Sequence, residues 1–307
     1  MFFKKNKDDS DDAEESKKEE VELPDDVKER YAKSGYQESK DLTKEDIYVL
    51  FCEKENWPEF DSNSGESNVE KFLHSLNKIG TYSYSNIIFP DKIEGIGKDS
   101  RFFDCIFYCT VKIDADPAAH ESFHFNDCIF FGDVEVDGAN SVSLSNCICG
   151  EKSYHSVVIK AQSMISIRKT KASILRIASE NIDIFDSELN QLAFCKTGES
   201  FDKLGKPMKS SFKRSIIRSF EFDTASSKIA LLSITECFIN YFSNISSESE
   251  LDILSVSYSM IDEIILFDII CGDISVSETE VKNILRIQSK GRIFLDDFYL
   301  LNASRES

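Results

Sequence analysis

The stretch FHFNDCIFFGDVEV, residues 123–136, alternates large apolar residues with polar ones. Side chains two residues apart lie on the same face of a β-strand, so Phe123 and Phe125 share one face. Cys128 follows after a spacing of three, which is expected where the chain turns a corner and its next inward side chain still points inward. The stretch therefore predicts strands that bury one face, and it gives no reason to group its thiol, imidazole and carboxylates as a metal or redox site.

The same frame recurs along the chain when Cys128 is taken as position zero. Apolar residues stand five and three residues before position zero and two after it, and several copies continue five and seven residues after it. Position zero is occupied by Cys105, Cys128, Cys147, Thr170, Ser187, Ser215, Cys237, Ser259, Thr279 and Phe298. The average step is about 21 residues, which is typical of a stacked repeat.

A spacing that alternates two and three closes a coil after about four corners, and coils of this kind stack through parallel strand hydrogen bonds. The sequence therefore predicts a mainly β fold, a single-stranded parallel β-solenoid of about ten turns of roughly 21 residues over residues 96–307. A sandwich would need recurring hairpin dipeptides, and the chain has a single Asp-Gly pair, at 137–138. Cys, Ser and Thr interchange at position zero, which favours core packing for these cysteines.

This frame, with FNDCIF at residues 125–130 as its clearest copy, resembles the repeat of a degenerate pentapeptide-repeat right-handed parallel β-helix. The resemblance implies a binding role without catalysis and a tendency to self-associate through coil ends. Pentapeptide-repeat proteins of the topoisomerase-protecting kind are believed to mimic duplex DNA with an acidic surface, so the resemblance also implies that an acidic face here could do the same.

The residues before the repeat predict a tail and a cap. Residues 1–26 are almost all charged or polar and are expected to form a disordered acidic tail. Residues 27–95 are expected to form a helical N-terminal cap, with a capping pair at Thr43 and Asp46 and a capping box at Ser67 and Glu70. The second helix has an apolar stripe and a glycine stop, at Val69, Phe72, Leu73, Leu76, Ile79 and Gly80.

Charge and composition limit the classes of function. A net charge of −19 argues against direct binding of nucleic acid or of an anionic membrane. Nine cysteines without an export signal predict reduced thiols and a cytoplasmic location. Of the four histidines, His124 falls at an outward position and His120 in a corner insertion, and no phosphate loop, HExxH motif or nucleophile elbow is present. No metal, cofactor or catalytic residue is therefore predicted.

Two surfaces are candidates for binding a partner protein. Residues 248–280 contain many acids and no lysine or arginine, so an acidic face is expected from Glu248, Glu250, Asp252, Asp262, Glu263, Asp268 and Asp273. Residues 203–218 form a basic segment in the longest step of the repeat, and a protruding loop is expected there with Lys206, Lys209, Lys213 and Arg214.

The sequence thus predicts a non-enzymatic binding or scaffold protein whose partner is another protein. Because the repeat runs to Leu300 and Leu301 without a following helix, a homo-oligomer through the C-terminal end is expected. One alternative is an acidic DNA mimic that binds and inhibits or protects a DNA-binding enzyme. A further alternative is a carbohydrate-active β-helix enzyme, with carboxylates near corners of adjacent turns at Asp114, Asp116, Asp133 and Asp137.

Overall fold

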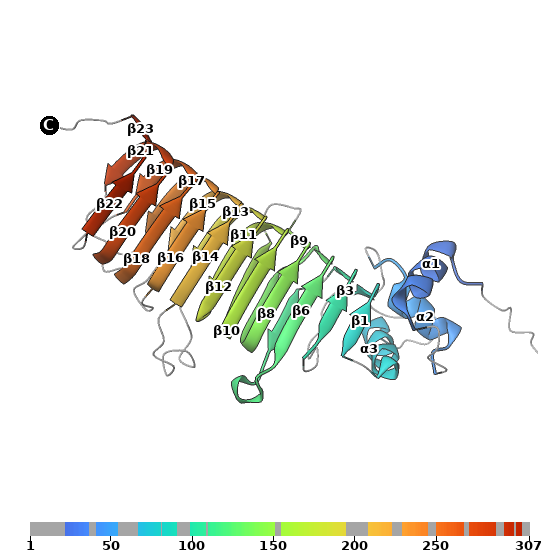
Figure 1. Cartoon of the computed structure of the whole chain (residues 1–307). Coiled ribbons are helices and arrows are strands. Elements are labelled where there is room, and N and C mark those ends of the chain that lie inside the picture. Colours follow the sequence, from blue (N-terminus) through green and yellow to red (C-terminus); the bar gives the residue numbers. More distant parts are fainter. Residues whose placement is uncertain are drawn as a thin grey trace, which may run out of the picture.

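The protein is an elongated stack of parallel strands with three helices at its N-terminal end (Figure 1). The computed structural model describes residues 22–36, 41–54, 67–80, 82–90, 99–108, 110–150, 155–194, 208–222, 229–244, 250–266, 270–286, 292–297 and 299–302. The helices are α1 (Asp25–Ser34), α2 (Lys44–Phe51) and α3 (Asn68–Ile79), with a short 3-10 helix η1 (Pro117–Ala119). In these residues, no helix is long and apolar enough to cross a membrane.

The strands of the first half are β1 (Ser83–Ser85), β2 (Ile88–Phe89), β3 (Arg101–Phe103), β4 (Ile106–Phe107), β5 (Val111–Asp114), β6 (Ser122–Asn126), β7 (Ile129–Phe130), β8 (Val134–Ser145), β9 (Ile148–Cys149), β10 (Ser156–Arg168), β11 (Lys171–Ala178) and β12 (Asn181–Phe185). The strands of the second half are β13 (Glu188–Phe194), β14 (Met208–Lys213), β15 (Ile216–Phe222), β16 (Ile229–Thr235), β17 (Phe238–Asn244), β18 (Glu250–Ser257), β19 (Met260–Ile265), β20 (Ile270–Ser277), β21 (Glu280–Arg286), β22 (Arg292–Asp296) and β23 (Tyr299–Asn302).

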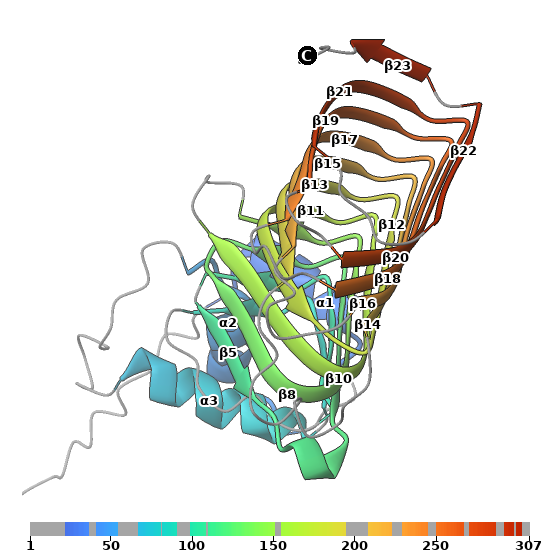
Figure 2. The ribbon, with the colours of Figure 1, turned by 90° about the vertical axis from the view of Figure 1, so that its left-hand side faces the viewer.

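Parallel ladders run along the molecule. One joins β1, β3, β6, β8, β10 and then every even-numbered strand to β22, and another joins β2, β4, β7, β9 and then every odd-numbered strand to β23. Phe212 pairs with Ile234 and Ile234 with Val256, so these steps are 234 − 212 = 22 and 256 − 234 = 22 residues. Figure 2 shows the strands of successive turns stacked on one another. The predicted parallel β-solenoid is confirmed, with a period of about 22 residues.

The core column matches the predicted inward positions. Phe123, Phe125, Cys128 and Phe130 are each 0% exposed. The position-zero residues from Cys105 to Thr279 are all buried, while Phe298 lies outside the described residues. Inward phenylalanines of neighbouring turns stack face to face, as in the Phe102–Phe125 pair, whose ring centroids are 4.7 Å apart. Stacking of like side chains at matched positions is what makes the interior continuous.

A left-handed corner precedes position zero in every described turn, and the sequence frame did not include it. Asp127 and Asn146, for example, both have φ of 55°. The corner residues are Asn86, Asp104, Asp127, Asn146, Lys169, Asp186, Arg214, Glu236, Tyr258, Glu278 and Asp297. Asn and Asp tolerate this conformation better than other side chains, and they hold most of these positions. The corner turns the chain sharply, so that the next residue again points inward.

The solenoid begins earlier and the helices begin earlier than predicted. β1 pairs with β3 and β2 pairs with β4, so the stack starts before residue 96, the predicted boundary. α1 starts at Asp25, inside the segment assigned to the tail. The predicted capping pair of α2 is present, as a full capping box between Thr43 and Asp46, whereas at the predicted box of α3 Ser67 makes no side-chain capping bond.

The helices cover the N-terminal edge of the stack through named contacts. The Phe72 ring of α3 packs edge-on against Phe89 of β2, with centroids 5.5 Å apart. The Tyr36 hydroxyl donates to the Ser83 carbonyl oxygen and accepts from the Ser85 amide, both at 2.8 Å. One phenol therefore bonds two backbone groups on the outer side of β1, which makes this side of the strand less available to a neighbouring strand.

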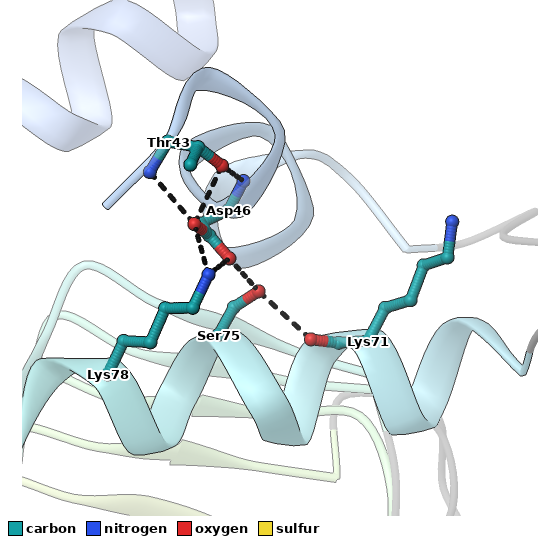
Figure 3. A network of polar contacts seen from close by, with 5 residues as sticks. All are labelled: Thr43, Asp46, Lys71, Ser75 and Lys78. Atoms are coloured by element: carbon teal, nitrogen blue, oxygen red, sulfur yellow. Dashed lines mark hydrogen bonds and ion pairs between the residues drawn. The ribbon is translucent and has the colours of Figure 1, made fainter. Parts of the chain in front are cut away.

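A buried carboxylate fastens α2 to α3 (Figure 3). Asp46 of α2 is 5% exposed and accepts bonds from the backbone amide and the hydroxyl of Thr43. From α3, Lys78 Nζ lies 2.8 Å from Asp46 Oδ2 and Ser75 Oγ donates to Asp46 Oδ1 at 2.7 Å. Burial alone would raise the pKa of Asp46, but the bonds from Lys78, Thr43 and Ser75 together hold it well below its usual value.

Candidate partner-binding surfaces

The predicted acidic face is distributed over several columns of the solenoid. Glu250 and Asp252 lie exposed on β18, and Glu263 lies exposed on β19. Register places Glu263 between Tyr241 and Asn283 of the adjoining turns, so its column is not a run of acids. Glu248 and Asp268 lie outside the described residues.

Two of the predicted acids are neutralised by cations from the next turn. Asp262 Oδ1 lies 2.6 Å from Lys282 Nζ, and Asp273 Oδ2 lies 3.0 Å from Arg292. These partners lower the pKa of both carboxyl groups, that of Asp262 through Lys282 and that of Asp273 through Arg292. Residues 248–280 contain no lysine or arginine, but Lys282 and Arg292 of the following turns lie beside these acids in the folded chain.

The predicted basic loop is partly wrong. Residues 208–213 form β14, with Met208, Ser210 and Phe212 buried, so the chain there belongs to the stack and does not protrude. Lys209 and Lys213 are exposed on that strand, and Arg214 is at its left-handed corner. The inward residues of β14 are hard to recognise in the sequence, because Ser210, a polar residue, occupies the inward position between Met208 and Phe212. Lys206 lies outside the described residues.

Arg214 is already bound by its own chain. Its Nε lies 2.8 Å from Asp186 Oδ1 and its Nη2 lies 2.9 Å from Asp186 Oδ2, one turn back. Its guanidinium carbon lies 4.2 Å from the centroid of the Phe185 ring. A bidentate and stacked arginine of this kind is held in place, so its charge is not free for a partner.

The carboxylates considered for carbohydrate chemistry are also engaged. Asp114 and Asp137 are register partners in β5 and β8. Asp137 Oδ2 lies 2.9 Å from Lys160 Nζ, and Asp133 accepts from the Ser156 amide at 2.7 Å. Asp116 accepts from the Ala118 amide at the start of η1. These contacts give Asp116, Asp133 and Asp137 a structural role, while Asp114 Oδ2 lies 3.7 Å from the exposed Lys112 Nζ. Across the described ranges no cluster of three or more His, Cys, Asp or Glu could hold a metal ion.

Position zero forms a polar ladder inside the corner, which explains why Cys, Ser and Thr interchange there. The Thr170 hydroxyl donates to the Arg168 carbonyl oxygen at 2.9 Å and accepts from the Cys147 amide at 3.3 Å. The same pair of bonds recurs at Ser187, at Ser215 and at Ser259. Small size is therefore only part of the role of this position, since the hydroxyls bond a buried backbone amide and the thiols of Cys128, Cys147 and Cys237 donate to carbonyl oxygens.

The thiols in this ladder are poor nucleophiles. Burial raises the pKa of Cys128 and of Cys237. The pKa of Cys147 is raised by its hydrogen bond with Cys128 and by burial. Because the thiolate is the reactive form, these cysteines are suited to packing and not to redox or metal chemistry at neutral pH.

Replacing Thr170 with valine is expected to lower the free energy of unfolding by about 1–3 kcal/mol. The two side chains have nearly the same shape, so the change removes the hydroxyl and leaves the buried Cys147 amide without that acceptor. Urea denaturation followed by circular dichroism measures the effect. Ser166→Ala, which removes a hydroxyl from a partly buried outer position of β10, is the matched control, and an equal loss in both variants would count against the ladder.

A groove with a volume of about 530 Å³ runs along the left-handed corner of the second half of the stack. One wall is made by the corner residues Arg214, Glu236, Tyr258 and Glu278, and the other by Ile216, Phe238, Met260 and Glu280, which are register partners in β15, β17, β19 and β21. The floor is the polar ladder at Ser215, Cys237 and Ser259. The sequence frame placed these wall residues outside the core but did not bring them together.

The far edge of the stack differs from the edge that Tyr36 bonds. In the described residues, β22 pairs only with β20 and β23 pairs only with β21. Each therefore presents one row of backbone groups to no neighbouring strand in this part of the structure. Such rows are templates for pairing with another chain.

The fold defines the class of the protein as a parallel β-solenoid with three N-terminal helices. No family model, no curated protein and no solved structure matches the chain.

Proposed function

We propose that the protein is a non-enzymatic β-helical binding and scaffold protein that self-associates through the last turn of its solenoid, β22 and β23. The observation that carries the proposal is the difference between the two edges of one stack. The first strands β1 and β2 also have one strand partner each, but Tyr36 bonds the Ser83 carbonyl oxygen and the Ser85 amide of β1, and Phe72 of α3 packs against β2. In the described residues β22 and β23 likewise have one strand partner each, and no helix packs on them. A second copy that pairs with this edge would satisfy both rows of backbone groups at once.

Substitution of Leu301 in β23 by lysine is expected to prevent this association. A lysine on an edge strand disfavours pairing with a second chain, and natural proteins protect exposed strand edges in this way. Sedimentation velocity over a range of concentrations should give a dimer for the wild-type chain and a monomer for Leu301→Lys.

Ser257→Lys is the matched control, because it adds the same charge on the outer side of β18, a strand that is paired on both sides. It should sediment as the wild-type chain does. A wild-type chain that remains monomeric at the highest concentration would refute self-association, and so would a Leu301→Lys dimer of unchanged stability.

The finer assignment, a right-handed coil of the pentapeptide-repeat kind in the cytoplasm, is part of the same proposal. It is supported by the spacing of the inward residues and by the general right-handedness of parallel crossover connections. Acidic mimicry of DNA has less support, because Lys282 and Arg292 neutralise two of the acids that would form its surface.

A further inference from the structure

We propose that the groove lined by Glu236, Phe238, Tyr258, Met260, Glu278 and Glu280 binds a segment of a partner protein in which basic residues flank an apolar side chain. The proposal rests on the suggested binding role but not on self-association, since the groove lies on the side of the stack and not at its end.

The groove exposes apolar side chains to solvent, at positions where outward residues of a solenoid are usually polar. Ile216 is 48% exposed and Tyr258 is 58% exposed, and Phe238 and Met260 between them are partly exposed. Their column is continuous, because Ile216 pairs with Phe238 and Phe238 with Met260. Aromatic residues and methionine are enriched in protein interfaces, and methionine adapts its shape to different partners.

The charge of the groove selects a cationic partner. Glu236 and Glu278 are exposed on one wall and Glu280 is partly exposed on the other, while the one guanidinium of the lining is bound by Asp186. Lys213 Nζ lies 4.0 Å from Glu236, and a surface pair of that length contributes little.

Tyr258 adds a second feature that suits a basic side chain. The nearby Glu278 carboxylate raises the pKa of its phenol. Tyr258 and Glu278 are corner residues of adjacent turns and line the same groove, so that a lysine or arginine could contact the carboxylate and the ring face together.

The spacing of the carboxylates is compatible with a short peptide. Glu236 and Glu278 occupy the same corner two turns apart, which corresponds to about 10 Å at the usual separation of adjacent strands. In an extended chain, residues three apart are separated by a similar distance, about 10 Å. Two basic residues with apolar residues between them can therefore reach both carboxylates while the apolar side chains cover Phe238 and Met260.

Binding of a fluorescein-labelled peptide of sequence KKFLKK to the full chain, followed by fluorescence anisotropy, tests the proposal. The variant Glu236→Gln, Glu278→Gln and Glu280→Gln is expected to bind it at least about tenfold more weakly than the wild-type chain. A peptide KKSSKK should bind the wild-type chain more weakly than KKFLKK, because it cannot cover the apolar wall.

The control variant removes three charges elsewhere, through Asp104→Asn, Glu250→Gln and Glu263→Gln, and so has the same net charge as the groove variant. It should bind KKFLKK as the wild-type chain does. Equal weakening in both variants would show attraction to the overall negative charge and would overturn the proposal, as would equal binding of KKFLKK and KKSSKK. Sedimentation of the groove variant is expected to be unchanged, which separates this test from that of the last turn.

Discussion

Replacing Phe125 with alanine is expected to lower the free energy of unfolding by about 3–5 kcal/mol, the largest effect of any single change considered. The Phe125 ring stacks on Phe102 at 4.7 Å and meets Phe130 edge-on at 5.4 Å, and it is 0% exposed. In a stack each turn contacts only its neighbours, so other parts of the core cannot fill the cavity. Urea denaturation followed by circular dichroism should show a lower midpoint.

His124→Ala is the control for this result, because His124 directly precedes Phe125 in β6 and points outward. It should change the midpoint little. Phe125→Leu keeps most of the buried volume and should lie between the two. If Phe125→Ala unfolded at the same urea concentration as His124→Ala, the stacked phenylalanines would not be the source of stability in the first turns.

Replacing Asp46 with alanine is expected to cost about 2–4 kcal/mol at pH 7, because Lys78 and Ser75 lose the carboxylate that they bond inside the cap. The difference should depend on pH with a definite sign. The pKa of Asp46 is depressed in the folded chain, so its contribution is complete above the unfolded pKa and is lost as the pH falls toward the folded pKa. At pH 3, about one unit below the unfolded pKa, the cost should be smaller by about 1 kcal/mol.

Denaturation of the two proteins at pH 7 and at pH 3 measures this change, and other carboxylates cancel in the comparison. Asp41→Ala is the control, as it removes a nearby exposed carboxylate just before α2. A gap between wild type and Asp46→Ala that stayed constant or widened at pH 3 would contradict the account of the network in Figure 3.

The inward side of the solenoid could be predicted from sequence because alternation is a local property. Spacings of two and three around Cys128, Cys147 and Thr170 gave the buried column, and these residues are at most 1% exposed in the structure. The left-handed corner also had a signal, since Asp104 and Asp127 precede position zero, but later turns use other residues there.

The outer surfaces could not be predicted in the same way, because they depend on which turn lies beside which. Lys282 is 20 residues beyond Asp262 in the sequence (282 − 262) and 2.6 Å from it in the structure. The groove depends on the same register, which places Phe238 beside Met260. Similarly, the repeat could not show that Tyr36, outside any strand, bonds the edge of β1.

The direction of the polar ladder has a consequence for synthesis of the protein. Where the next position zero is Ser or Thr, its hydroxyl bonds the position-zero amide of the turn before it, as Thr170 bonds Cys147 and Ser187 bonds Thr170. The helices and Tyr36 leave the ribosome first, so the first strand emerges beside a finished edge. At translation rates of about 5–20 residues per second, a new turn becomes available every few seconds and completes the one before it. Folding can thus keep pace with translation, one turn at a time.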